Sequence, residues 1–261
     1  MIKSISSLQN PLVKQISQLL EKPRERRKTG LFVVEGKREI ELAQKGGYSI
    51  DTVLVCPEIY GEIPSEMDTS NLIEISLEVY QKLAYRKTTE GIIAILKSKE
   101  HSLEDLDVGD NPLILVAEAP EKPGNIGALL RTADAANLDA VIIANPRTDL
   151  YNPNIIRSSV GCLFTRQIAI GSTQEIISYL KKNKISIFCA ALQASKPYHN
   201  CDFSRSSAIV VGTEADGLSD EWLDNSDQNI IIPMQGEIDS MNVSVAAGIL
   251  IFEASRQRNF E

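Results

Sequence analysis

Three polar segments that contain glycine each follow an apolar stretch of the sequence. They are Pro123–Arg131, Gly212–Ser219 and Ile232–Gly236, the last followed closely by Ser240–Ala246. Glycine lets the backbone approach a ligand closely and offer its N–H and C=O groups. Ligands of open parallel sheets bind outside the carboxyl ends of the strands, so three such segments predict one shared pocket. Taken singly, each also has a plain structural interpretation as a helix entry or a solvated turn.

The first segment lacks the fingerprints of the common phosphate-binding loops. It is not G-x-G-x-x-G, and Ala144-Asn145-Pro146 stands where a dinucleotide site needs an acidic residue. No G-x-x-x-x-G-K-[ST] occurs in the sequence. If the helix begins near Gly127, Arg131 lies one turn in and could hold a phosphate by a bidentate contact. The spacing equally allows an ion pair with Asp134 at i+3.

The sequence holds few of the residues from which other common catalytic sites are built. The sequence has two histidines, His101 and His199, and four cysteines without a C-x-x-C pair. We therefore expect no metal site and no Ser-His-Asp or Cys-His catalyst. No apolar run approaches the ~18 residues that span a bilayer, and Met1-Ile2-Lys3-Ser4 has no apolar core of a signal peptide. A cytoplasmic protein with reduced thiols is expected.

The formal net charge of −8 averages over unlike parts. Residues 1–46 carry ten basic and five acidic residues, a net of +5, and residues 47–261 carry a net of −13. The basic cluster contains Arg24, Arg26, Arg27 and Lys28. It suits phosphate contacts, although a solvated helix end is the alternative. Glu118 and Glu121, before the first segment, make that mouth more acidic than an RNA site would prefer.

The hydrophobic pattern predicts an α/β protein. Short apolar strands and amphipathic helices form a small unit over residues 1–97, and the polar stretch 98–111 is the predicted linker. Over residues 112–261, strands alternate with helices, which indicates a parallel sheet covered on both faces. The strands of this part are predicted at 112–117, 140–144, 164–170, 185–192, 208–211 and 229–232. Its helices are predicted at 127–137, 172–182 and 243–256.

The three segments resemble the motifs of the SpoU (TrmH-like) RNA 2′-O-ribose methyltransferases of the SPOUT superfamily. The matching patterns are Asn125-x-Gly127-x-x-x-Arg131, Gly212-x-Glu214-x-x-Gly217-Leu218, and Ile232-Pro233-Met234-x-Gly236 with Ser240–Ala246. The N-terminal region resembles the family's substrate-binding domain, which is similar to an RNA-binding ribosomal protein. Asn10-Pro11-x-Val13-Lys14 and Phe32-Val33-Val34-Glu35-Gly36 carry that likeness.

The resemblance implies a deep trefoil knot in the C-terminal sheet, bound S-adenosylmethionine and an RNA-methylating homodimer. Ribosomal RNA is the favoured substrate, and transfer RNA remains open. A non-catalytic RNA-binding protein on the same fold and a different nucleotide-dependent enzyme are the alternatives. The implied catalytic residues are Arg131, Asn125, Glu214, Ser240 and Asn242. The implied cofactor-binding residues are Leu192, Gly212, Thr213, Glu214, Gly217, Ile232, Met234, Met241 and Asn242. Arg131 and Arg157 join the N-terminal basic cluster as predicted RNA contacts.

Overall fold

The computed structural model describes residues 3–61, 71–85, 90–193, 195–213, 216–237 and 240–260. The chain divides into two compact units, Met1–Glu100 with Asp149–Arg157, and His101–Thr148 with Ser158–Glu261. Residues 149–157 thus pack with the first unit, although the sequence pattern places them in the second part of the chain.

Five strands of the first unit form a mixed sheet in the order β1–β4–β3–β5–β2. These strands are β1 Lys3–Ile5, β2 Leu31–Glu35, β3 Ile50–Val55, β4 Leu72–Ile75 and β5 Ile92–Lys97. The helices are α1 Pro11–Glu21, α2 Pro23–Thr29, α3 Lys37–Lys45, α4 Pro57–Tyr60, α5 Leu77–Leu83 and α7 Pro153–Ser158. The buried faces of α1 and α5 cover one side of the sheet, with Ile16, Leu19 and Tyr80 at most 1% exposed.

In the described residues of the second unit, seven strands form a sheet in the order β10–β12–β9–β11–β6–β7–β8, and every neighbouring pair is parallel. The strands are β6 Leu113–Glu118, β7 Ala140–Ala144, β8 Gln167–Gly171, β9 Ser186–Ala190, β10 Lys196–Pro197, β11 Ser207–Val211 and β12 Gln228–Ile231. The helices are α6 Pro123–Ala135, α8 Thr173–Lys182, α9 Asp220–Asn225 and α10 Val243–Gln257. Single 3-10 turns occur at Leu103–Asp105, Cys162–Phe164 and Tyr198–Asn200.

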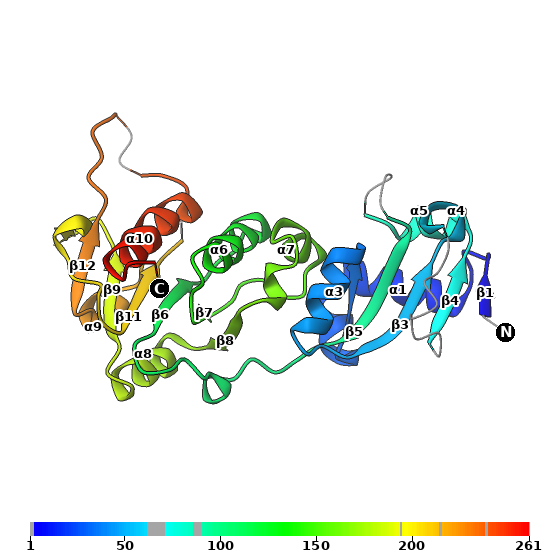
Figure 1. Ribbon diagram of the computed structural model, residues 1–261, viewed down its shortest axis with the longest axis horizontal. Coiled ribbons are helices and arrows are strands. Elements are labelled where there is room, and N and C mark those ends of the chain that lie inside the picture. The colour runs from blue at the N-terminus through cyan, green and yellow to red at the C-terminus, as the bar shows by residue number, and fades with distance from the viewer. Residues whose placement is uncertain are drawn as a thin grey trace. The chain divides into compact units, whose positions relative to one another are not determined.

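Helices cover both faces of this parallel sheet, as the alternating pattern predicts. Figure 1 shows α6 and α10 side by side on one face, with α8 and α9 on the other. The fully buried Trp222 of α9 and Ile176 of α8 fill the core on their side. On the opposite side, Gly248 of α10 faces Thr132 of α6, where a Cβ would make ordinary van der Waals contact at 3.8 Å.

Local sequence explains the ends of several helices. Ser172 and Glu175 form a reciprocal capping box at the start of α8. The helix α6 begins at Pro123, four residues before the predicted start at Gly127, because proline suits the first helical turn. Strand β8 begins only at Gln167, since Cys162–Phe164 forms a 3-10 turn. Among the residues described, no helix is both long and apolar enough to cross a membrane.

Candidate functional site

The carboxyl ends of four neighbouring strands, β12, β9, β11 and β6, lie along one edge of the parallel sheet. The three motif segments follow β6, β11 and β12. The second and third line one cavity, whereas the first lines a smaller neighbouring cavity, so the predicted convergence on a single pocket is correct for only two of the three. The segment after β9, Ala191–Gln193, joins them because β9 lies between β12 and β11. The alternation of strands and helices could not reveal this neighbour, since the order of strands in a sheet depends on tertiary pairing.

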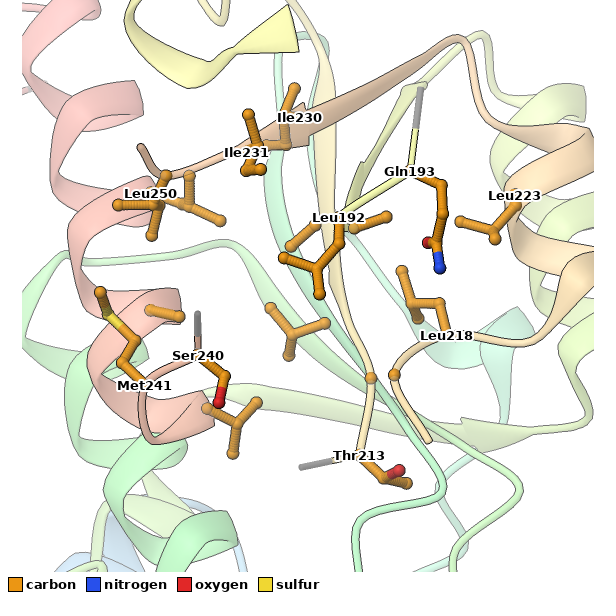
Figure 2. Close-up of a pocket in the computed structure, with 18 of the residues that line it drawn as sticks. Leu192, Gln193, Thr213, Leu218, Leu223, Ile230, Ile231, Ser240, Met241 and Leu250 are labelled. Carbon is orange, nitrogen blue, oxygen red and sulfur yellow. The ribbon is translucent and has the colours of Figure 1, made fainter. Parts of the chain in front are cut away.

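A cavity of about 730 Å³ opens where the loops after β9, β11 and β12 meet the start of α10. In Figure 2, Leu192 lies in the middle of the group, between Ser240 and Met241 on one side and Leu218 on the other. Seven of the predicted cofactor residues line the cavity: Leu192, Gly212, Thr213, Gly217, Ile232, Met234 and Met241. Ser240, predicted to be catalytic, also lines it. Glu214 lies outside the described residues.

The segment after β11 turns back tightly on itself. Thr213 and Gly217 exchange backbone hydrogen bonds at 3.0 and 3.1 Å, and Thr213 Oγ1 accepts the N–H of Asp216 at 2.9 Å. Gly217 has a φ of +71°, which glycine adopts without strain. A Cβ on Gly212 would lie 2.6 Å from the nitrogen of Leu218 and closer still to the carbonyl of Gly217. Only glycine therefore fits at position 212 with this turn in place.

Glu118 anchors that turn from beneath. It is 8% exposed, and its carboxylate accepts the N–H of Ser219 at 2.9 Å and the Ser219 hydroxyl at 2.7 Å. Thr173 Oγ1 lies 3.4 Å from the same carboxylate and in turn accepts the side-chain amide of Asn145 at 2.9 Å. The sequence alone predicts that Glu118 adds to an acidic mouth at the first segment. The structure corrects this, because the carboxylate is buried and its hydrogen bonds hold the loop.

The other acidic residue at this mouth is also compensated. Glu121 forms an ion pair with Arg147, and both side chains are about half exposed (54% and 53%). Of the two acids at this mouth, Glu118 is thus buried in a hydrogen-bond network and Glu121 is paired with a surface cation.

Asn125 and Asn242 meet beside the cavity rather than inside it. The Asn242 amide donates to Asn125 Oδ1 at 3.1 Å, and its own Oδ1 caps α10 by accepting the N–H of Ser244 at 2.9 Å. Asn125 lines a second, smaller cavity of about 80 Å³, which shares Gly212 and Thr213 with the larger one. Asn242 is therefore a helix cap and a partner of Asn125, and it is not among the residues that line either cavity.

Arg131 is exposed on α6, about two turns from the start of the helix, rather than one. It lines neither cavity of its own chain. The alternative ion pair with Asp134 does not form. Asp134 instead accepts the Thr165 hydroxyl at 2.5 Å and lies 3.5 Å from Arg166.

The predicted RNA-contact residues separate into two groups. Arg24, Arg27 and Lys28 are exposed on α2, and we call them the α2 cations. Arg26 is 4% exposed, pairs with Asp149 and donates to the Leu19 carbonyl at 2.5 Å, so it holds the first unit together instead of facing solvent. Arg157 is exposed near the end of α7, with its guanidinium over the ring of Tyr85.

The cavity fits S-adenosylmethionine. Its volume lies within the ~300–1,000 Å³ typical of small-ligand sites. Aliphatic side chains dominate the lining, and Thr213, Ser240 and Asp216 supply a few polar groups suited to the hydroxyl and amino groups of a nucleoside. Leu192 and Met234 remain 57% and 38% exposed at the cavity, and a ligand bound there would cover them. The fold and site thus define a cofactor-binding α/β protein whose cavity lies at the strand ends of a parallel sheet.

Comparison with known proteins gives the family. Residues 112–252 match the SpoU rRNA Methylase family, and residues 10–94 match the MRM3-like substrate binding domain. The chain is 32% identical over 252 residues to the 23S rRNA (guanosine(2553)-2′-O)-methyltransferase RlmP of Bacillus subtilis, covering 96% of this chain and 98% of that protein. The chain therefore belongs to the SpoU rRNA methylase family.

Solved structures agree with this assignment along nearly the whole chain. The AdoMet-bound rRNA methyltransferase of Sinorhizobium meliloti superposes with a TM-score of 0.89 at 27% identity, covering 98% of each chain. An RNA 2′-O ribose methyltransferase structure is 38% identical with a TM-score of 0.82, covering 98% of this chain and 99% of that one. The predicted family, α/β fold, N-terminal substrate-binding domain and cofactor are confirmed.

Proposed function

We propose that this protein transfers a methyl group from S-adenosylmethionine to a ribose 2′-hydroxyl of 23S ribosomal RNA. The observation that carries the proposal is the 730 Å³ cavity, because residues of the second and third family motifs line it. RlmP of Bacillus subtilis and the 23S rRNA (uridine(2479)-2′-O)-methyltransferase of Streptomyces viridochromogenes are both named for 2′-O-methylation of 23S rRNA, and both match over at least 95% of this chain.

The cofactor supplies an electrophilic sulfonium methyl. Around it, the chain must position a ribose hydroxyl in line with that methyl and ease its deprotonation. Ser240 lies in the cavity lining, and the hydrogen-bonded Asn125–Asn242 pair stands next to it, so these three groups can orient the ribose. A guanidinium stays protonated in proteins, so Arg131 acts through phosphate positioning and electrostatics, with a phosphate oxygen or water accepting the proton. Glu214 keeps the supporting role that the family motif gives it.

A homodimer completes the site in this proposal. Arg131 does not line the cavity of its own chain, so a second copy is needed to bring a guanidinium to the reacting groups. The helix α10 supports such contact, because Val245 and Phe252, seven residues apart on one face, are 54% and 43% exposed. Measuring the mass in solution tests this directly, and a Phe252→Glu variant is expected to be monomeric.

The remaining parts of the proposal follow the family. Residues 1–97 form the RNA substrate-binding domain, 98–111 the linker and 112–261 the methyltransferase domain, in line with the family matches at 10–94 and 112–252. The segment leading into α10 is threaded through a loop to form a trefoil knot, a rare exception to the rule against knotted chains. The protein acts in the cytoplasm.

The test is a transfer assay. The protein is incubated with radiolabelled S-adenosylmethionine and either ribosomal or transfer RNA, and 2′-O-methylation is then mapped. Label in 23S rRNA is the expected result, and label in transfer RNA alone would redirect the proposal to that substrate. Cofactor binding without transfer to any RNA would favour a non-catalytic RNA-binding protein, and no cofactor binding would favour a different nucleotide-dependent enzyme.

A further inference from the structure

The first unit carries an exposed pair made by an aromatic ring and a guanidinium. The guanidinium carbon of Arg157 lies 4.4 Å from the centroid of the Tyr85 ring. Tyr85 is 51% exposed, and Arg157 is exposed as well. The pair joins the end of α5 to α7, two elements far apart in the sequence.

The backbone on both sides of this pair is anchored. The Tyr85 N–H donates to Glu35 Oε2 at 2.8 Å, and Ile155 and Ile156 of α7 are buried next to Arg157. An exposed cation–π contact contributes little to stability, because water competes for the cation. The contact between the two side chains therefore adds little to the free energy of unfolding, although the backbone holds both at the surface.

The segment next to the pair also carries exposed cations. Lys37 and Arg38 open α3 directly after β2, and both are exposed. Carboxylates lie there too: Glu35 accepts the Tyr85 N–H, Glu90 accepts the Lys37 N–H at 2.6 Å, and Glu39 lies close to Gly36. Lys37 and Arg38 thus add exposed cations within three residues of Glu35, the residue that holds the Tyr85 backbone.

We propose that Tyr85 and Arg157 form a stacking platform for one unpaired base of the RNA substrate, a role that rests on the proposed function. Unpaired bases stack on aromatic rings and on guanidinium planes, and such stacking is largely independent of sequence. The platform and the α2 cations lie at different places on the first unit, and they bind RNA through different interactions. The helix α2 leads into the start of β2, whereas Glu35, which anchors Tyr85, ends that strand. The α2 cations contribute salt-dependent affinity, and the platform contributes affinity that depends on the base.

Two RNA probes separate these contributions. Fluorescence anisotropy measures the Kd of a short oligoadenylate and of an abasic oligomer of the same length, for the wild type and for Tyr85→Leu. Loss of one stacked base is expected to weaken oligoadenylate binding by ~5- to 150-fold. Binding of the abasic oligomer, the salt slope and kcat at saturating 23S rRNA are expected to stay unchanged. Tyr85→Phe keeps the ring and should bind like the wild type, as should Phe260→Ala, which removes an aromatic side chain that is 68% exposed in the other unit.

Arg157→Lys keeps the positive charge but removes the planar guanidinium. It should therefore weaken binding of oligoadenylate relative to the abasic oligomer without changing Tm or the salt slope. This variant also decides the question if Tyr85→Leu does not fold. Equal binding of oligoadenylate by the wild type and Tyr85→Leu, or an equal loss for both oligomers, would overturn the platform. Failure of the wild type to methylate any RNA would refute the proposed function, while the comparison of Kd values still decides the platform.

Discussion

Replacing Glu118 by alanine should loosen the cofactor cavity from below. The carboxylate accepts two hydrogen bonds from Ser219, at 2.9 and 2.7 Å, directly after the turn that ends at Leu218. Leu218 and Gly217 both line the cavity. Glu118 does not line the larger cavity, and its side chain acts on that cavity by holding the loop.

The expected loss follows from these bonds. Hydrogen bonds to a charged group contribute ~1.5–3 kcal/mol each, and a donor left unsatisfied costs ~1–3 kcal/mol. Ser219 itself is exposed, so water can replace part of the lost contact. We therefore expect the free energy of unfolding to fall by about 2 kcal/mol in Glu118→Ala. Glu118→Gln retains an acceptor for the Ser219 hydroxyl but turns a donor toward the Ser219 N–H. Its free energy of unfolding should lie between those of the wild type and Glu118→Ala.

The effect should extend to the cofactor. If binding must restore the order of the loop, each 1.4 kcal/mol of ordering free energy weakens the affinity for S-adenosylmethionine by about tenfold. Denaturant unfolding gives the stability and isothermal titration calorimetry gives the Kd. Glu121→Ala is the matched control, because its exposed ion pair with Arg147 is worth at most ~1 kcal/mol. A Glu118→Ala variant within ~0.5 kcal/mol of the wild type, with unchanged cofactor affinity, would refute the anchoring role.

Four further outcomes are expected. Arg131→Ala should abolish methyl transfer in the radiolabel assay and leave cofactor affinity nearly intact, and wild-type turnover would exclude the role assigned to it. Neutralising the α2 cations together should weaken RNA binding and flatten its dependence on salt, measured as the slope of log Kd against log salt concentration, whereas an unchanged slope would remove them from the interface. Gly212→Ala should eliminate cofactor binding in calorimetry, because its Cβ would collide with the backbone of Gly217, and normal affinity would contradict the turn geometry. The hydrogen bond from Arg256 lowers the pKa of Glu253 from 4.5 to about 2, so this pair stabilises the fold above pH ~4.5 and loses its contribution as the pH falls toward 2. Chemical unfolding of the wild type and Glu253→Gln should therefore differ by at most ~1 kcal/mol near neutral pH and converge in acid, and a difference that grows in acid would reverse the sign of the linkage.

Strongly periodic elements were predictable because their pattern reflects burial on one face. The strand at 140–144 and the helix at 172–182, with Ser172 as its cap, lie within a residue of their predicted bounds. Short elements such as α2 and α7 carry too few apolar positions to show a period, and none was predicted there. The start of α6 was placed too late because the glycines after Pro123 suggested a loop.

The basic cluster shows that local sequence also fails to predict the burial of single residues. Arg24, Arg26, Arg27 and Lys28 are alike in sequence, and all were predicted to contact RNA. Only tertiary packing separates Arg26, which lies against the end of α1 and pairs with Asp149, more than a hundred residues away. Charge and spacing within a segment hold no information about such a distant partner.

The sequence by itself determined the family, the α/β architecture and two of the segments that line the cavity, those after β11 and β12, because local motifs and periodicity are written in consecutive residues. Tertiary structure alone decided which side chains face that cavity. It brought the segment after β9 between its neighbours, buried Glu118 as an anchor, and left Arg131 outside the cavity of its own chain. The physical reason is that strand order, burial and ion pairing depend on contacts between residues far apart in the chain, and those contacts exist only once the sheet has formed.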